Sequence, residues 1–286
     1  MIYILYNPFA DNNNGENNVK TMLKSMKKEY QEGILISLKD LDYKEFFSKL
    51  HEEDKVILFG GDGTLNRFVN EVYNKYQLPC KFFLHRAGTG NDFAFDNENE
   101  FDEEGLLYLN EKIKFLPKII VKGKEYYFVN GIGYGIDGEC CRVADELKVK
   151  GKKKINYTSI TIKLLLFKYK GPNAHVIVDG KEYNFKKTIL AASMFGRYYG
   201  GGMKVAPMQD RNSKLLTFCG FTCKRGKIGT LIIFPSIFKG EHIKYKDITT
   251  LVKGKTIKVE FDKPMALQID GEVIKDVTSY VATTEY

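Results

Sequence analysis

The sequence predicts an α/β + β fold: an α/β domain over residues 1–116 followed by a mainly antiparallel β domain over residues 117–275. Two observations support this prediction. Up to about residue 115, apolar strand-like runs alternate with helix-like patterns, which is typical of a parallel sheet covered by helices. Beyond residue 117, short apolar runs are separated by turn signals, which indicates antiparallel strands.

The elements of the first domain follow in order along the chain. The expected strands cover residues 2–6, 34–38, 55–59 and 80–84, and the expected helices cover residues 16–29, 43–51 and 64–76. The acidic stretch from Asp96 to Glu104 interrupts the alternation and is predicted to be a solvated loop.

In the second domain, strand-like runs occur at 119–121, 126–129, 175–178 and 183–185. Asp179-Gly180 and Asp270-Gly271 each suit a two-residue hairpin, whose turn needs positive φ angles. Two helices are expected inside this domain, at about 138–148 and 154–169.

A glycine-rich turn stands between the third expected strand and the helix that follows it. Its residues are Gly60, Gly61, Asp62, Gly63 and Thr64. Backbone N–H groups without an obstructing Cβ, together with a helix N-terminus, favour a bound phosphate. The acid beside such a phosphate implies an intervening cation, so the turn predicts Mg²⁺–nucleotide. The alternative is a tight βα turn in which Asp62 is only a local cap.

A second glycine-rich loop follows the next strand and has the sequence Gly88-Thr89-Gly90-Asn91-Asp92. Two such loops at successive strand ends suit a nucleotide lying across the carboxyl edge of a parallel sheet. Neither loop matches the P-loop pattern or the dinucleotide-binding pattern.

Charge and composition narrow the range of partners. The net charge is +8 and the isoelectric point is about 9.0, which favours anionic partners. The lysines between Lys148 and Lys154 form the densest basic cluster, which is either an anionic membrane contact or a solvated loop. No nucleic-acid-binding signature accompanies the charge, so no nucleic-acid partner is expected.

The location of the protein is predicted from missing signals. There is no signal-peptide pattern at Met1–Tyr6, and the five cysteines have no paired spacing, so we expect a cytoplasmic protein with reduced thiols. No apolar run approaches the roughly 20 residues of a membrane span. Any membrane association is therefore expected to be peripheral.

Five motifs in order resemble the diacylglycerol kinase catalytic-domain family, which includes soluble bacterial lipid kinases and the sphingosine kinases. The resemblance runs from residue 2 to about residue 275, and the last two motifs are the most specific for the lipid-kinase branch. The motifs are Asn7-Pro8-Phe9-Ala10, Gly60–Asn66, Gly88–Ala94, Gly196–Pro207 and Gln268–Glu272.

The resemblance implies an ATP-dependent, Mg²⁺-dependent kinase that phosphorylates a hydroxyl of diacylglycerol or a similar lipid alcohol at an anionic membrane surface. It implies an NAD kinase-like or phosphofructokinase-like first domain and a β-sandwich second domain. It also implies that residues 276–286 return to pair with the first domain. A homodimer is compatible with the sequence.

The resemblance also assigns site residues. Asp62 and Asp92 would hold Mg²⁺, and either Asp270 or Glu272 would accept the proton of the lipid hydroxyl; these four are the expected catalytic acids. Ser37 is a weaker match to a nucleotide contact. The residues expected to bind the nucleotide are Asn7, Ala10, Gly60, Gly61, Asp62, Gly63, Thr64, Asn66, Gly88, Thr89 and Asn91.

One departure from the family pattern concerns a second-domain metal. The family usually has an acid after the Tyr-Gly-Gly-Gly segment that holds a structural Mg²⁺, whereas this chain has Asn212-Ser213-Lys214. A serine hydroxyl is a poor substitute for a carboxylate at a hard cation, so we expect that site to be absent.

Three other functions stay open at this point. The acceptor could be another lipid alcohol, such as a sphingoid base, a monoacylglycerol or a polyprenol. The chain could also be a catalytically silent regulator that binds nucleotide or lipid, although all four expected catalytic acids are present. An NAD kinase ranks third.

Overall fold

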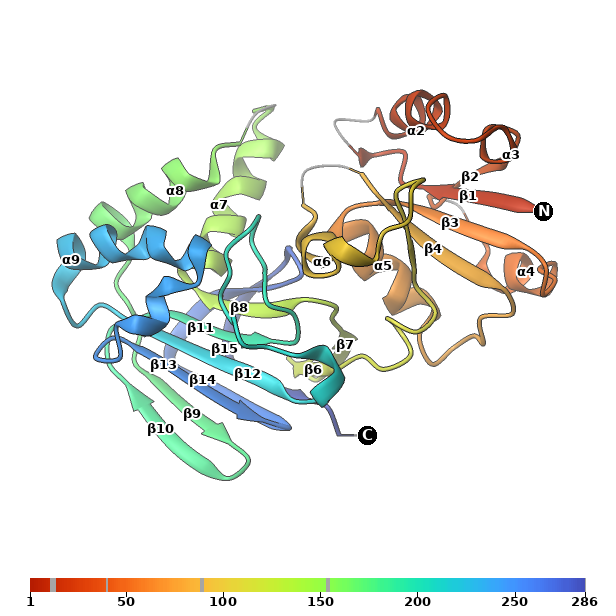
Figure 1. Cartoon of the computed structure of the whole chain (residues 1–286). Coiled ribbons are helices and arrows are strands. Elements are labelled where there is room, and N and C mark those ends of the chain that lie inside the picture. Colours follow the sequence, from red (N-terminus) through yellow and green to blue (C-terminus); the bar gives the residue numbers. More distant parts are fainter. Residues whose placement is uncertain (11–13, 40, 88–89, 153–154, 286) are drawn as a thin grey trace. The chain divides into compact units, whose positions relative to one another are not determined.

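The computed structural model describes residues 1–286 except 11–13, 40, 88–89, 153–154 and 286 (Figure 1). It divides into two compact units, Met1–Leu116 and Pro117–Tyr286. The first is an α/β unit and the second is built on antiparallel strands, which confirms the predicted fold class.

The first unit contains one sheet with the strand order β2-β1-β3-β4-β5. The first four strands along the chain pair in parallel, and β5 pairs antiparallel to β4. The antiparallel edge strand was not predicted. The strands are β1 (Ile2–Tyr6), β2 (Ile34–Ser37), β3 (Lys55–Gly60), β4 (Lys81–Arg86) and β5 (Leu106–Tyr108).

Helices connect these strands and cover the sheet. The expected helix over 16–29 is two shorter helices in the structure. The first ends at Leu23, and the Ser25 hydroxyl donates a hydrogen bond to the Met22 carbonyl just beyond that end. The helices are α2 (Gly15–Leu23), α3 (Lys28–Gln31), α4 (Tyr43–Ser48), α5 (Asp62–Val72) and α6 (Asp92–Asp96), with a 3₁₀ turn at Glu98–Glu100.

The sheet of the first unit buries side chains on both faces. On one face Ile4 and Ile57 pack with Val19 and Leu23 of α2. On the other face aromatic rings dominate, and their centroids lie 5.6 to 5.9 Å apart: Tyr3 with Phe46, Phe47 with Phe82, and Phe68 with Phe82. This two-sided burial explains why β1 and β3 are almost continuously apolar.

The second unit is built on one large antiparallel sheet. Its main path is β13-β12-β11-β8-β14-β15-β6-β7, and β9 pairs with both β10 and β14. The strands are β6 (Lys118–Val121), β7 (Lys124–Tyr127), β8 (Gly131–Gly135), β9 (Ala174–Val178), β10 (Lys181–Phe185), β11 (Thr188–Met194), β12 (Leu216–Thr222), β13 (Thr249–Gly254), β14 (Thr256–Ile269) and β15 (Glu272–Thr283).

The strand β15 corrects one expectation. It pairs with β14 along its length and with β6 at its end, where Val281 lies opposite Ile120 and Ala282 opposite Ile119. Residues 276–283 therefore belong to the second unit, and the prediction that 276–286 returns to the first domain is wrong. The alternating apolar side chains of this strand are buried within the second unit, which is why it pairs there.

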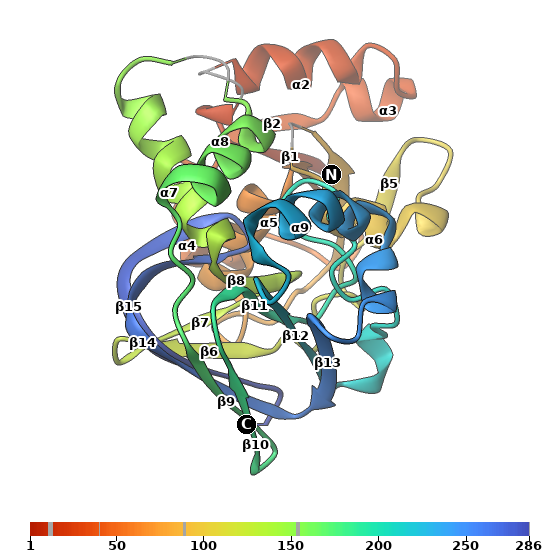
Figure 2. The same ribbon diagram turned by 90° about the vertical axis from the view of Figure 1, so that its left-hand side faces the viewer.

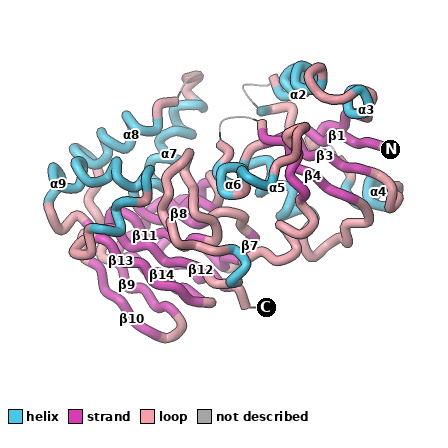
Figure 3. Tube along the Cα trace, in the orientation of Figure 1, coloured by secondary structure: helices cyan, strands magenta, loops and turns pink. Residues whose placement is uncertain are grey.

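Helices lie on one side of this sheet (Figures 1 and 3). They are α7 (Ile136–Val149), α8 (Tyr157–Lys163), which continues into a π-helical turn at Leu164–Lys168, and α9 (Gly226–Ile233). Short 3₁₀ segments cover Arg211–Ser213, Phe234–Lys239 and Glu241–Lys244. The two predicted helices are present, whereas α9 was not predicted. No helix among the described residues is long and apolar enough to cross a bilayer.

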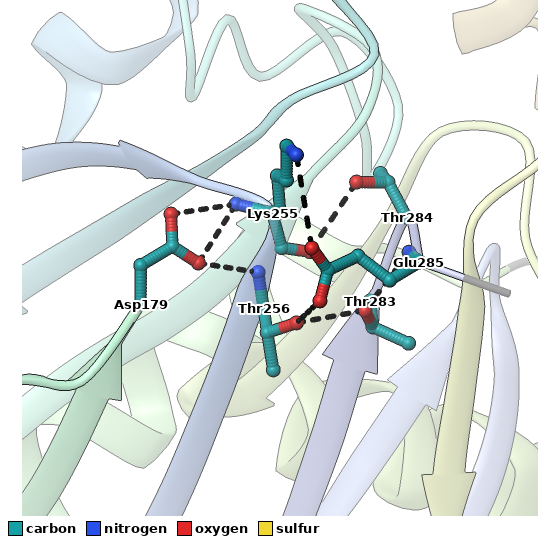
Figure 4. A network of polar contacts seen from close by, with 6 residues as sticks. All are labelled: Asp179, Lys255, Thr256, Thr283, Thr284 and Glu285. Atoms are coloured by element: carbon teal, nitrogen blue, oxygen red, sulfur yellow. Dashed lines mark hydrogen bonds and ion pairs between the residues drawn. The ribbon is translucent and has the colours of Figure 1, made fainter.

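The predicted Asp179-Gly180 hairpin joins β9 to β10, and both residues have positive φ angles, +47° and +82°. The Asp179 carboxylate accepts hydrogen bonds from the backbone N–H groups of Lys255 and Thr256 at 2.8 to 3.0 Å (Figure 4). The Thr256 hydroxyl in turn lies 2.8 Å from that of Thr283. This aspartate therefore anchors a hairpin to the start of β14.

The two units differ in charge. The first carries 14 lysine and arginine residues against 20 aspartate and glutamate residues, a formal charge of −6. The second carries 30 against 16, a formal charge of +14, and together they give the +8 of the chain. The basic character of the protein thus belongs to the second unit alone.

Candidate functional site

The predicted site residues occupy two places, one in each unit. In the first unit they lie at the carboxyl ends of β1, β3 and β4. Strand register places Tyr6 beside Phe59 and Gly60 beside Arg86, so the loops after these three strands are neighbours. From β1 the chain passes to β2 on one side of β1, and it then crosses to β3 on the other side. The direction of strand addition therefore reverses at β1. In open α/β sheets, ligands bind at such a switch point.

Asp62 ties the loops after β3 and β4 together. Its carboxylate accepts hydrogen bonds from the backbone N–H groups of Asp92 at 2.8 Å and Phe93 at 2.9 Å, the first residues of α6. The Asp62 N–H donates to the Gly90 carbonyl at 2.9 Å. Asp62 therefore caps α6, about 30 residues away along the chain, and is not the local cap of its own turn that was the alternative interpretation. Binding of Mg²⁺ by Asp62 and Asp92 stays a prediction.

The glycines of the first loop allow this close approach. A Cβ on Gly61 would lie 2.1 Å from the Gly90 carbonyl oxygen, and one on Gly60 would lie 2.4 Å from the Thr64 Cβ. Gly61 is the N-cap of α5 and has no side-chain cap. The first turn of α5, which includes Gly63 and Thr64, thus begins without a competing side-chain acceptor at its cap, as an anion site requires.

The other predicted nucleotide contacts surround this loop pair. Asn7 follows β1, and its backbone carbonyl accepts the Ala10 N–H at 3.1 Å. Asn66 is buried on α5, and Asn91 is the N-cap of α6. Ser37 ends β2 and its hydroxyl accepts the Lys39 N–H. Gly88 and Thr89 lie outside the described residues.

In the second unit, Asp270 occupies the turn between β14 and β15. It has a φ of +47°, and Gly271 has a φ of +97°, so this is the predicted two-residue hairpin. The buried Asp270 carboxylate accepts backbone N–H bonds from Val129, Asn130 and Gly131 at 2.6, 2.9 and 2.9 Å. Three donors compensate its charge and occupy three of its roughly four lone-pair sites. Glu272, the first residue of β15, is exposed.

The segment Val129–Gly131 joins several predicted motifs of the second unit. The Asn130 carbonyl accepts the N–H groups of Phe195 and Gly196 at 2.8 Å, at the start of the glycine loop. The Arg211 guanidinium donates to the Val129 carbonyl and, at 3.0 Å, to the Asn130 side-chain oxygen. The Asp270 hairpin, the glycine loop and the 211–214 turn therefore converge on one backbone segment.

The glycine loop itself is a closed turn. Gly200, Gly201 and Gly202 have φ angles of +66°, +82° and +97°, which other residues rarely adopt. Backbone hydrogen bonds of 3.1 Å in both directions join Tyr199 and Met203 across it. The three glycines are thus required by the backbone conformation of the loop.

A buried aspartate, Asp137, contacts Tyr199 of this loop, and it was not among the site residues predicted from the sequence. The Asp137 carboxylate, near the start of α7, accepts a hydrogen bond from the Tyr199 hydroxyl at 2.9 Å. Burial raises the pKa of the Asp137 carboxyl to about 6. A Cβ on Gly133 would lie 1.4 Å from one Asp137 oxygen and 2.6 Å from the Gln268 amide nitrogen. Gly131, Gly133 and Gly135 alternate along β8 just before Asp137, and this glycine spacing was the available sequence signal.

The residues at the expected second-domain metal position form a turn of their own. The Asp210 carboxylate accepts the Asn212 N–H at 2.9 Å, and the Ser213 hydroxyl donates to the Asp210 carbonyl at 2.6 Å. Lys214 has a φ of +54° and ends this turn. The absence of a structural metal at this position stays a prediction.

Two family models match the chain. The diacylglycerol kinase catalytic domain matches residues 1–113, and the YegS C-terminal NAD kinase beta sandwich-like domain matches residues 130–284. The second model alone covers more than half of the chain.

Individual proteins agree with these matches. The chain is 26% identical to "Putative lipid kinase SAB0675c" of Staphylococcus aureus strain bovine RF122 over 80% of this chain and 75% of that protein. It is 25% identical to "Putative lipid kinase SA0681" of strain N315 over the same shares.

Solved structures share the fold. "The crystal structure of a diacylglycerol kinases from Bacillus anthracis str. Sterne" is similar with a TM-score of 0.65 and 21% identity, covering 99% of this chain and 93% of that one. A second structure from the same organism has a TM-score of 0.69 at 19% identity, covering 99% of this chain and 91% of that one. One family model matches the first unit and the other matches most of the second. The chain belongs to the diacylglycerol kinase catalytic-domain family.

Proposed function

We propose that this protein is an ATP-dependent, Mg²⁺-dependent lipid kinase that transfers the γ-phosphoryl group to a hydroxyl of diacylglycerol or a similar lipid alcohol. The observation that carries the proposal is the pair of loops after β3 and β4, joined by Asp62 at the switch point of the parallel sheet. Family membership supplies the reaction class.

The first unit suits a nucleotide with a bound cation. The α5 N-terminus and the glycine backbone offer N–H donors to phosphate oxygens. Asp62 and Asp92 supply the carboxylate oxygens that Mg²⁺ prefers, and a carboxylate that accepts two N–H bonds retains lone pairs for a metal. When bound, the metal would neutralise charge on the transferring phosphoryl group.

Of the two acids in the second unit, Glu272 is the better proton acceptor for the lipid hydroxyl. A proton arriving at Asp270 would weaken the hydrogen bonds that its carboxylate accepts from three buried N–H groups, whereas Glu272 is exposed. We therefore assign Asp270 the role of positioning the hairpin and Glu272 the role of general base. In the proposed step the lipid hydroxyl loses its proton to Glu272 as its oxygen attacks the γ-phosphorus, and the bond from that phosphorus to the β–γ bridging oxygen breaks so that ADP leaves.

We further propose that the protein works in the cytoplasm as a peripheral membrane protein, because its lipid acceptor resides in a bilayer. The +14 charge of the second unit supports attraction to an anionic membrane surface.

The test is a thin-layer assay with radiolabelled ATP against diacylglycerol, monoacylglycerol, a sphingoid base and a polyprenol in mixed micelles, with and without Mg²⁺. We expect Mg²⁺-dependent label in one phosphorylated lipid. Glu272→Gln should lower the rate about 10²- to 10⁴-fold. Glu285→Gln, an exposed acid in the same unit, is the matched control and should have no effect. Nucleotide binding without labelled lipid would instead identify a silent regulator.

A further inference from the structure

The helices of the second unit expose large apolar side chains. Phe167, in the π-helical turn after α8, is 78% exposed, and Ile228 and Ile232 of α9 are 72% and 74% exposed. Ile162 of α8 is also exposed. Single exposed apolar residues are ordinary on protein surfaces, but several on neighbouring helices indicate an interaction surface.

The helix α9 is apolar on both of its faces. Thr230 and Ile233 point into the unit and are buried, whereas Ile228 and Ile232, four residues apart, share the outer face. A helix on the surface of a soluble domain normally presents polar residues outward. The outer face of α9 therefore lacks the composition of a water-facing surface.

The exposed residues of α9 and of the π-helical turn are neighbours. The Lys227 ammonium of α9 donates a hydrogen bond of 2.7 Å to the carbonyl of Leu166, the residue before Phe167. Both views place α8 and α9 in the same helical layer over one side of the sheet (Figures 1 and 2). Phe167, Ile228 and Ile232 thus lie on two adjacent elements.

The charged residues within these two segments are all basic. Residues 157–170 contain three lysines and no acid, and residues 222–240 contain three lysines, one arginine and no acid. Of these, Arg225 pairs with Asp247 at 2.7 Å. Lys163, Lys168 and Lys224 are exposed beside the apolar residues. Long lysine side chains can lie along apolar surface while their ammonium groups reach anionic groups.

A cavity of about 510 Å³ opens beside the same turn, between α7 and the residues that follow α8. Val143, Leu147, Leu164 and Met265 give it apolar walls. Its charged lining residues are the basic Arg142, Lys150, Lys168, Lys170 and Lys263 and the acidic Glu139 and Glu146, both of which pair with Arg142. The cavity therefore shares Leu164 and Lys168 with the π-helical turn that carries Phe167.

We infer that the outer faces of α9 and of the π-helical turn after α8 form the surface by which this protein docks on a bilayer containing anionic phospholipid. The charge of the flanking lysines selects a negatively charged surface, and the outward isoleucines and phenylalanine enter the apolar boundary of the lipid. This inference deepens the proposed function and rests on it for the lipid acceptor.

The inference moves the membrane contact away from the predicted lysine cluster. Within that cluster Lys148 pairs with Asp145 at 3.0 Å, and Lys153 and Lys154 lie outside the described residues. The exposed apolar side chains are on α9 and the π-helical turn, where the lysines alternate with them.

A tryptophan scan tests the docking face directly, because the chain contains no tryptophan. Each variant, Phe167→Trp or Ile228→Trp, has one fluorescent reporter. We expect a blue shift and quenching by brominated lipid on adding vesicles of phosphatidylcholine with phosphatidylglycerol, and little change with phosphatidylcholine alone. The matched control is Ile120→Trp on β6, where the isoleucine is 42% exposed, and its emission should not respond.

Vesicle sedimentation gives a second measurement. The double variant Ile228→Ser, Ile232→Ser should bind anionic vesicles at least about tenfold more weakly than the wild type, since apolar groups are removed from the lipid boundary. Ile120→Ser should bind as the wild type does. An equal response of the control reporter and the two reporters on the docking face, or undiminished binding of the double variant, would overturn the inference. So would a blue shift that appears without vesicles as protein concentration rises, which would identify a second copy of the chain as the occupant.

Failure of docking and failure of the proposed function give different results. If both hold, the double variant keeps wild-type activity on a water-soluble short-chain diacylglycerol and loses activity on vesicle-bound acceptor. If the wild type phosphorylates no lipid yet the reporters respond to anionic vesicles, the docking surface stands and the kinase proposal fails.

Discussion

The two units use the same device in opposite electrostatic surroundings. In the first unit, of formal charge −6, Asp62 accepts two backbone N–H bonds from the start of α6. In the second, of formal charge +14, Asp270 accepts three from Val129–Gly131. A buried carboxylate can thus fix a loop in either unit. Under the proposed function, the acidic unit would need a cation to hold a nucleotide, whereas the charge of the basic unit favours anions without one.

The largest effect is expected for a variant of the first unit that removes its buried carboxylate. Asp62→Ala removes a proposed metal ligand and the link between two loops, so we expect turnover to fall at least about 10²-fold. Because two buried N–H groups lose their acceptor, the free energy of unfolding should also fall by about 1–3 kcal/mol. Radiolabel transfer and urea unfolding measure the two effects. Activity above about a tenth of the wild-type rate would remove Asp62 from the catalytic set.

The matching change in the second unit should act mainly on stability. Asp270→Ala leaves three buried N–H groups without their carboxylate, and we expect the free energy of unfolding to fall by about 2–5 kcal/mol. Asp179→Ala is the control, because Asp179 occupies the same kind of Asp-Gly turn at an exposed position. A loss no greater than that of the control would show that the Asp270 contacts contribute little.

The pH dependence of stability provides a smaller test within the second unit. Burial raises the pKa of the Asp137 carboxyl from 3.8 to about 6, so the protonated form is favoured in the folded state. Its stabilising contribution is complete below about pH 4 and is lost as the pH rises through 6. Relative to Asp137→Asn, the wild type should lose about 1–3 kcal/mol across that window in urea unfolding. Parallel profiles for both proteins would contradict the assignment.

The smallest effect concerns metal without nucleotide. Since Ser213 stands where the family resemblance implies an acid, we expect millimolar Mg²⁺ alone to leave the melting temperature nearly unchanged, although the proposed reaction requires Mg²⁺. A structural cation at a hundredfold saturation would stabilise by about 2.7 kcal/mol. Differential scanning fluorimetry with Mg²⁺ and with EDTA measures this. A marked shift would reinstate a metal site near Asp210.

Much of the fold was predictable because the spacing of apolar residues and the positions of turn-forming residues indicate the same strands and helices along the chain. The runs of β1 and β3 and both Asp-Gly hairpins were identified this way. The helix α9 was missed because isoleucines on both of its faces hide the amphipathic pattern. The position of β15 was missed because an alternating strand says which face is buried and not which strand is its partner.

The sequence predicted which residues belong to the candidate site better than it predicted which groups those residues contact. The sequence identified Asp62, Asp270 and the glycines, but the backbone partners of both carboxylates depend on loops 30 and about 140 residues away along the chain. The contact of Asp137 with Tyr199 is likewise long-range, at a separation of 62 residues. No local pattern encodes such pairings.

The pairing of β15 has a consequence for synthesis on the ribosome. This strand is the latest in the chain among those of the second sheet, yet it lies between β14 and β6, the first strand of that sheet. All strands of the first unit precede residue 117, so its sheet can close while the second is still being translated. The second sheet can close only after residues 272–283 have left the exit tunnel. Until then β6 has β7 on one side but lacks β15 on the other, so one edge of this strand stays open to mispairing or to a chaperone.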